Sequence, residues 1–106
     1  MGRDSLDALR RNLRDRRVQV YGLARSGIAA AALGETIFVF GGEAPEGTFD
    51  QVEAYQPRQD RWTRFAAMPS ARHGLGAVAL GGRIYVIAGG TTPGGSSSAL
   101  NEIFTP

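Results

Sequence analysis

The chain of 106 residues contains no cysteine and only one histidine, His73. The absence of thiols excludes a disulfide framework, a thiolate zinc site and a cysteine nucleophile. A single imidazole also excludes the metal sites that take two or three histidines from one chain. The sequence therefore predicts no bound metal, no cofactor and no catalytic residue.

Lysine is absent as well, and all 12 basic residues are arginine. A phosphate-binding loop of the type GxxxxGK[ST] therefore cannot be built. Residues 1–17 carry six arginines against three aspartates, whereas residues 18–106 carry six arginines against seven acidic residues. Because a nucleic-acid-binding body spreads positive charge over its folded surface, we expect no nucleic-acid partner.

Long apolar runs are also missing. No segment approaches the roughly 18 apolar residues of a membrane span, and the N-terminal sequence MGRDSLDALRRN has no apolar signal-peptide core. We therefore expect a soluble chain without a membrane partner, cytoplasmic by default and of otherwise unknown localisation. The 15 glycines and 5 prolines favour an all-β fold of many short strands joined by turns.

The second half of the chain repeats the first. Residues 25–42 and 72–90 share an arginine two positions before a glycine, then an apolar run, a glycine turn, a second apolar run and a glycine pair. Further on, residues 53–57 recur as residues 102–106. This period of 47 to 49 residues, with four strand-like runs in the complete unit, predicts the blades of a β-propeller.

Short apolar and β-branched runs between glycine, proline and aspartate mark the expected strands. They are residues 27–33, 36–41, 50–56 and 61–65 in the complete unit, and residues 74–80, 83–88 and 99–104 in the partial unit. We expect the first unit to span about residues 23–69 and the second about residues 70–106, without its fourth strand. Residues 91–98 include no apolar side chain and are expected to form a loop or a flexible tip.

Residues 1–22 form a separate, basic leader. Leu6, Leu9 and Leu13 have the spacing of one helix face, which predicts a short amphipathic helix. The alternating run of residues 18–21 comes directly before the first unit. By its position, this run is a candidate for an outer strand of a blade.

A glycine pair after an apolar strand, followed by a tyrosine, a tryptophan and a Met-Pro pair before an arginine, resembles the kelch repeat. The residues that carry this resemblance are Gly41, Gly42, Tyr55, Trp62, Met68, Pro69 and Arg72. In the second unit Gly89 and Gly90 match, but Phe104 replaces the tyrosine. The resemblance covers residues 25–106 and implies an all-β fold of about two kelch-like propeller blades, each a four-stranded antiparallel sheet.

Kelch-like propellers close a ring from several more blades than the two expected here. The resemblance therefore implies one of two arrangements. The chain is either the C-terminal portion of a larger propeller or a two-blade unit that associates with itself.

Three local patterns resemble catalytic or ligand-binding motifs but have simpler structural explanations. Residues 74–79 match GxGxxA, but this dinucleotide-binding motif needs a strand before it and a helix after it, and here it lies inside an expected strand. Glu43, Glu46 and Asp50 cluster in one loop, where a solvated polar surface explains them as well as an acid–base pair does. The two glycine pairs are expected to meet a backbone requirement, either positive φ or close approach between blades.

Charged residues recur with the repeat. Arg25 and Arg72 hold one repeat position, and Glu53 and Glu102 hold another, which predicts ion pairs within or between blades. Anion binding by the two arginines is the alternative. His73 is expected to be a structural residue at the start of a strand, with a general base near the ring axis as the alternative.

The aromatic residues Tyr55, Trp62 and Phe104 are predicted to be core anchors between neighbouring blades. If Trp62 is fully buried, its replacement by alanine would cost roughly 3–5 kcal/mol. An exposed Trp62 would instead indicate a binding hot spot.

The resemblance offers both an enzymatic and a non-enzymatic interpretation. Galactose-oxidase-like enzymes need a copper site with a Tyr–Cys crosslink, which a chain without cysteine does not form. We therefore expect a non-catalytic protein-binding or scaffold module, with a protein partner or self-association. The alternative is a fragment of a carbohydrate-active propeller enzyme of the sugar-acid epimerase type, with its other site residues outside this chain.

Overall fold

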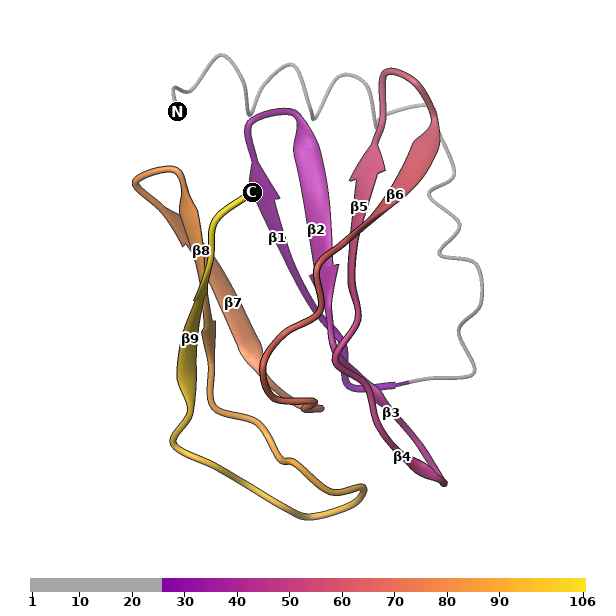
Figure 1. Ribbon diagram of the computed structural model, residues 1–106, viewed down its shortest axis with the longest axis vertical. Helices are drawn as coiled ribbons and strands as arrows, with labels where there is room; N and C mark the ends of the chain where they lie inside the picture. The colour runs from indigo at the N-terminus through magenta and orange to yellow at the C-terminus, as the bar shows by residue number, and fades with distance from the viewer. Residues whose placement is uncertain (1–25) are drawn as a thin grey trace.

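The computed structural model describes residues 26–106, which form two antiparallel sheets and a short hairpin. The first sheet has the strand order β1 (Ala29–Leu33), β2 (Thr36–Phe40), β5 (Val52–Gln56) and β6 (Arg61–Phe65). The second sheet has the order β7 (Gly76–Leu80), β8 (Arg83–Ile87) and β9 (Asn101–Phe104). The hairpin of β3 (Glu43–Ala44) and β4 (Gly47–Thr48) extends from the connection between β2 and β5 (Figure 1).

This architecture confirms the prediction of an all-β, antiparallel fold for residues 26–106, where no helix occurs and so none that could cross a membrane. The seven expected strands begin and end within two residues of their predicted positions. The β3–β4 hairpin escaped prediction because each of its strands has only two residues. The predicted leader helix, the run of residues 18–21 and Arg25 lie outside the described residues.

Glycine forms the tight turns between neighbouring strands. The β1–β2 turn has Gly34 at φ 63°, and the β7–β8 turn has Gly81 and Gly82 at φ 61° and 77°. Two-residue hairpin loops favour such positive φ values because the resulting twist matches that of the flanking strands. The repeat therefore places a glycine turn at the same end of both sheets (Figure 1).

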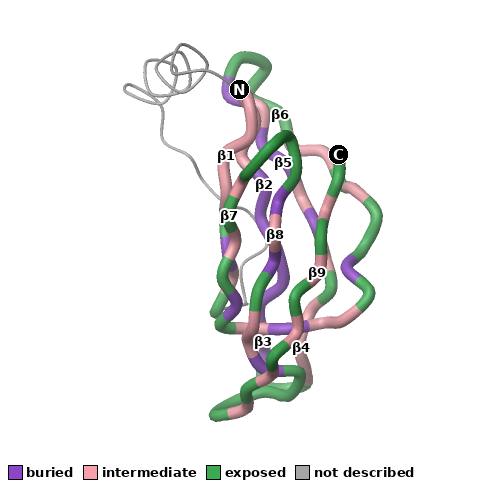
Figure 2. The backbone as a smooth tube through the Cα atoms, turned by 90° about the vertical axis from the view of Figure 1, so that its left-hand side faces the viewer, coloured by how far each residue is buried: buried purple, intermediate pink, exposed green. Residues whose placement is uncertain are grey.

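The two sheets pack face to face, and the core lies between them (Figure 2). Cross-strand register directs alternate residues of each strand into this interface. The first sheet contributes Ala29, Ala31, Leu33, Phe38, Phe40, Val52, Ala54 and Phe65, and the second contributes Ala77, Ala79, Ile84, Val86 and Phe104. Strands β1 and β7 contact each other across the interface, because the alanines on both strands allow a close approach.

The three aromatic residues singled out in the sequence lie in two places. Phe104 lies between the sheets, with its ring centroid 5.4 Å from that of Phe38 and 5.5 Å from that of Phe40. Tyr55 and Trp62 are cross-strand neighbours on the opposite face of the first sheet, and their ring centroids are 5.1 Å apart. Tyr55 is buried, whereas Trp62 is half-buried. Phe104 thus joins the two described sheets, and the Tyr55–Trp62 pair does not.

Candidate functional site

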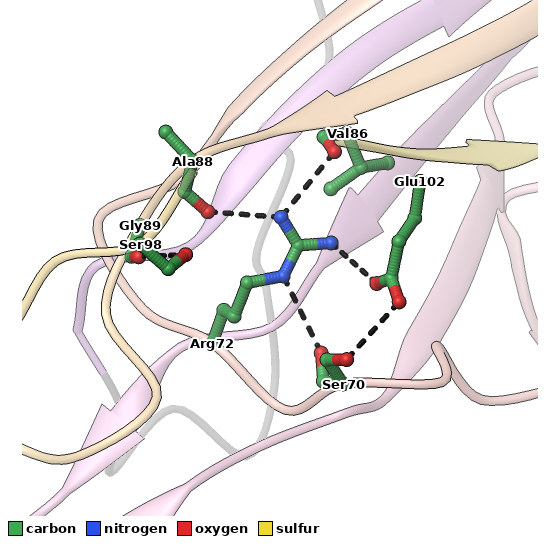
Figure 3. A network of polar contacts seen from close by, with 7 residues as sticks. All are labelled: Ser70, Arg72, Val86, Ala88, Gly89, Ser98 and Glu102. Carbon is green, nitrogen blue, oxygen red and sulfur yellow. Dashed lines mark hydrogen bonds and ion pairs between the residues drawn. The ribbon is translucent and has the colours of Figure 1, made fainter. Parts of the chain in front are cut away.

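A fully buried arginine, Arg72, lies against the second sheet (Figure 3). Its Nη2 lies 2.6 Å from Oε1 of Glu102 on β9. Its Nη1 donates to the backbone oxygens of Val86 at 3.3 Å and Ala88 at 2.8 Å. Its Nε donates to the backbone oxygen of Ser70 at 3.5 Å, and the Ser70 hydroxyl donates to Glu102 Oε2 at 3.1 Å. The network therefore engages both oxygens of the Glu102 carboxylate.

The hydrogen bonds of Arg72 are all made to groups of the protein itself. Four of the five guanidinium N–H groups have a protein acceptor, and the side chain has no exposed surface. Charge-assisted hydrogen bonds of this kind offset the cost of removing a guanidinium from water. The geometry favours an ion-pair role for Arg72 over anion binding.

Glu53 holds the position in the first sheet that Glu102 holds in the second. Glu53 pairs in register with Val39, as Glu102 pairs with Val86. Arg25, the repeat counterpart of Arg72, lies outside the described residues. An ion pair between Arg25 and Glu53 therefore stays a prediction.

The first glycine pair contacts the linker between the two sheets. The N–H of Gly42 donates to the backbone oxygen of Arg72 at 2.8 Å. Gly41 has φ 66°, and a Cβ atom at this position would overlap with the same oxygen. Both the backbone angle and the close contact therefore require glycine at position 41.

The second glycine pair contacts the next residue of the linker. His73 and Gly90 exchange two backbone hydrogen bonds, of 3.0 and 2.9 Å. Gly89 has φ 83°, and a Cβ atom there would lie 2.6 Å from the backbone oxygen of His73. The backbone of residues 72–73 therefore passes between the two glycine pairs, one from each sheet.

The side chain of His73 joins loops from both sheets. Its Nδ1 lies 3.3 Å from Oε2 of Glu43 on β3, and its Nε2 lies 3.5 Å from Oγ of Ser96 in the β8–β9 connection. The N–H of Gly94, in the same connection, donates to Glu43 Oε2 at 3.0 Å. We call this end of the molecule the loop end, and it comprises residues 43–48, 70–75 and 88–100.

Ser96, His73 and Glu43 have the composition of a nucleophile, base and acid triad, but not its hydrogen bonding. The Ser96 hydroxyl donates to the backbone oxygen of Thr92 and accepts a hydrogen bond from the N–H of Thr92. Its proton is therefore directed at the backbone and away from His73. Within residues 26–106, no group of three potential metal-ligating side chains occurs. The arrangement fastens the β8–β9 connection to the first sheet.

A groove of about 240 Å³ lies along the outer edge of β9, and residues 66–69 form its opposite wall. In the first sheet, β6 pairs with the corresponding edge of β5. Among the described residues, no strand pairs with this edge of β9. The second sheet therefore has an open edge where the first sheet has its fourth strand.

Comparison with known proteins gives the same repeat. The kelch motif matches residues 24–69 of the chain. The kelch-like protein terF of Aspergillus terreus (strain NIH 2624 / FGSC A1156) is 34% identical over 88 residues, which cover 79% of this chain and 19% of that protein. This chain belongs to the kelch-repeat family. It spans about a fifth of the length of the curated relative that it matches.

The two sheets of this kelch chain are accordingly blade-like, the first with four strands and the second with three among the described residues. Sequence reasoning did not find the contacts of Glu43 with His73 and Gly94, nor that of Ser96 with His73. The loop acids and the serine run show no periodicity that would pair them. The available signal was His73 itself, which directly follows the repeated arginine where the first kelch unit has Ser26.

Proposed function

We propose that this kelch chain is a non-catalytic protein-binding or scaffold module whose loop end contacts the protein partner. Kelch repeats generally mediate protein–protein interactions. Binding residues on repeat scaffolds are commonly carried by loops that a rigid framework positions. The loop end is a set of loops on a rigid framework, because loops from both blade-like sheets meet there (Figure 1).

The observation that carries the proposal is the fastening of these loops to one another. Besides the Gly94–Glu43 hydrogen bond, the Thr48 hydroxyl of the hairpin donates to the backbone oxygen of Thr91 at 2.9 Å. Loops that are held before binding lose less conformational entropy when a partner docks. The exposed residues they present are Pro45, Glu46, residues 91–95, Ser97 and Ala99.

Arg72 and His73 are both paired with acidic side chains of the protein, and this pairing supports binding over catalysis. Arg72 is fully buried against Glu102, and His73 contacts Glu43. In the alternative, a fragment of a carbohydrate-active propeller enzyme, an arginine of this kind would have to face the ligand. The burial of Arg72 disfavours that alternative for this part of the molecule.

A peptide selection with matched charge variants tests the proposal. Peptides are selected from a displayed library on the full chain, and their affinities are then measured for each variant. Glu46→Arg and Thr92→Arg place an arginine at the loop end, and Gln59→Arg places one in the exposed β5–β6 turn at the opposite end.

We expect the two loop-end variants to weaken binding roughly tenfold, or about 1.4 kcal/mol, and Gln59→Arg to leave it unchanged. Peptides that bind all three variants equally would place the binding surface elsewhere. A chain that enriches no peptide at all would also contradict the proposal.

A further inference from the structure

The chain leaves β8 through a residue in a strained backbone conformation, Ala88. Its φ is 59°, in the left-handed region, where a Cβ atom comes too close to the following carbonyl oxygen. Within residues 26–106, Asp60 is the one other non-glycine residue with positive φ. Asp60 lies in the tight β5–β6 turn, and a short polar side chain makes this conformation easier to adopt. Alanine has no polar side chain, so the strain at Ala88 must be held by its surroundings.

The first sheet has a glycine at the place that Ala88 takes in the second. The pairing of β1 with β2 ends at Phe40, and that of β7 with β8 ends at Ile87. Gly41 and Ala88 follow these two matched positions, with φ values of 66° and 59°. In space, Ala88 is therefore the counterpart of Gly41. The second sheet makes with an alanine the same turn that the first sheet makes with a glycine.

Both backbone groups of Ala88 are held by hydrogen bonds. Its N–H donates to the backbone oxygen of Leu100 at 2.7 Å, and its carbonyl oxygen accepts from Arg72 Nη1 at 2.8 Å (Figure 3). Arg72 is fully buried and is fixed in turn by Glu102 on β9. A strained conformation persists where several surrounding contacts determine it. The buried network around Arg72 is therefore in a position to keep Ala88 left-handed.

Ala88 also sets the direction of the β8–β9 connection. Two residues later, Gly90 exchanges two backbone hydrogen bonds with His73. Further along, the backbone oxygen of Thr91 and the N–H of Gly94 bond to the β3–β4 hairpin. A change of φ to the negative values that alanine prefers would turn the chain at Ala88. Residues 91–95 would then leave the hairpin.

We propose that residues 88–100 form a strap with its hinge at Ala88, and that Arg72 holds this strap closed on the β3–β4 hairpin. In the closed position Ala88 is left-handed and bonded to Arg72. In the released position Ala88 has negative φ, and the hydrogen bonds from residues 91 and 94 to the hairpin are broken. A single residue at the end of a strand absorbs the change, as is common for hinges.

Two opposing effects determine the position of the strap. The strain at Ala88 favours release, and the hydrogen bond from Arg72 favours closure. Arg72 is thus a positioning residue for the loop end, although it has no exposed surface. This inference deepens the proposed function and rests on it for its consequence, which is that the protein partner binds the loop end when the strap is closed.

Hydrogen exchange of the Gly94 amide in the full chain measures release of the strap, because this amide donates to Glu43 in the closed position. In the wild-type chain it should exchange faster than the amides of β5, which need unfolding of the first sheet. Ala88→Gly relieves the strain, since glycine adopts positive φ readily, and should slow the exchange of Gly94 at least roughly threefold. Ala99→Gly makes the same change in the same connection, at an exposed residue whose φ is not positive, and should not slow it.

Arg72→Lys tests what holds the hinge. Lysine keeps the charge but lacks the planar fork with which the guanidinium contacts Ala88 and Glu102 at once. The Gly94 amide should exchange at least roughly tenfold faster in this variant. Adding Ala88→Gly to it should slow the exchange again by at least roughly threefold, whereas adding Ala99→Gly should not. If Arg72→Lys does not fold, Ala88→Gly and Ala99→Gly in the wild-type chain still decide whether Ala88 is the hinge.

Four results would overturn the proposal. The first is exchange of Gly94 as slow as that of the β5 amides, which would mean that the connection opens only with the sheet. The others are no slowing in Ala88→Gly, equal slowing in Ala99→Gly, and an unchanged Gly94 rate in a folded Arg72→Lys chain. All of these measurements use the free chain, so their failure leaves the peptide-binding test of the proposed function standing.

Discussion

Arg72 Nη2 lies 2.6 Å from Glu102 Oε1 in a pair whose arginine side chain is fully buried. A second ion pair joins Arg58 to Glu35 at nearly the same distance, 2.7 Å, but its side chains are 58% and 36% exposed. The two pairs therefore differ in burial and in the further hydrogen bonds that Arg72 makes to backbone oxygens, and their comparison measures what the whole buried network adds to the stability of the chain.

Arg72→Ala should destabilise the chain by about 3 kcal/mol, because it leaves Glu102 and the carbonyl groups of Val86 and Ala88 without their donor. Arg58→Ala is the matched control and should cost less than about 1 kcal/mol, since exposed pairs are screened by water. Urea unfolding of both variants measures the difference. Equal losses would mean that the buried network contributes no more than a surface pair.

Gly41→Ala should destabilise the chain more than Gly34→Ala. Both glycines have φ near 65°, so both substitutions carry the cost of a left-handed alanine, about 1–2 kcal/mol. Only at Gly41 would the added Cβ overlap with the backbone oxygen of Arg72, whereas no atom lies within 4 Å at Gly34. We expect the overlap to add about 1–3 kcal/mol, measured by urea unfolding. Equal losses at the two positions would show that the linker moves aside freely.

Trp62→Ala should cost about 2 kcal/mol, less than the loss expected for a fully buried tryptophan, because the indole is half-buried and packs on Tyr55. Phe40→Ala, at a position with no exposed surface, should cost roughly 3–5 kcal/mol. Thermal unfolding of the two variants ranks them. A larger loss for Trp62→Ala would mean that the indole carries more of the packing than its exposure indicates.

The strands could be predicted from the sequence because the signals are local. The run of residues 37–40 is continuously apolar, is preceded by a turn glycine and ends at Gly41, and the repeat supplies the same pattern at residues 84–87. The kelch motif could be recognised for the same reason, since its glycine and aromatic positions have fixed spacing. Fold class and strand positions therefore follow from short-range patterns.

The loop end could not be predicted, because its contacts join residues far apart in the chain. Glu43 and Gly94 are 51 residues apart, the first in the β3–β4 hairpin and the second in the β8–β9 connection. Whether Trp62 lies in the core depends likewise on the face of the sheet from which its side chain projects, and the strand register determines that face. Such relationships depend on how the sheets are packed, which no local pattern in the sequence encodes.

Glu43→Ala should loosen the β8–β9 connection without unfolding the sheets. The carboxylate of Glu43 accepts the N–H of Gly94 at 3.0 Å and lies 3.3 Å from His73 Nδ1, so alanine removes the side-chain contacts that tie this connection to the β3–β4 hairpin at Glu43. Loss of a hydrogen bond to a charged group, worth about 1.5–3 kcal/mol, should speed hydrogen exchange of the Gly94 amide at least roughly tenfold. Glu46→Ala removes an exposed carboxylate of the same hairpin and should leave that exchange rate unchanged. The amides of β8, measured in the same experiment, report whether the sheets stay folded. If the Gly94 rate is the same in both variants, the connection is held by its own turn, by the backbone bonds of Gly90 and by the hydrogen bond from Thr48 to Thr91, and the loop end is not fastened through Glu43.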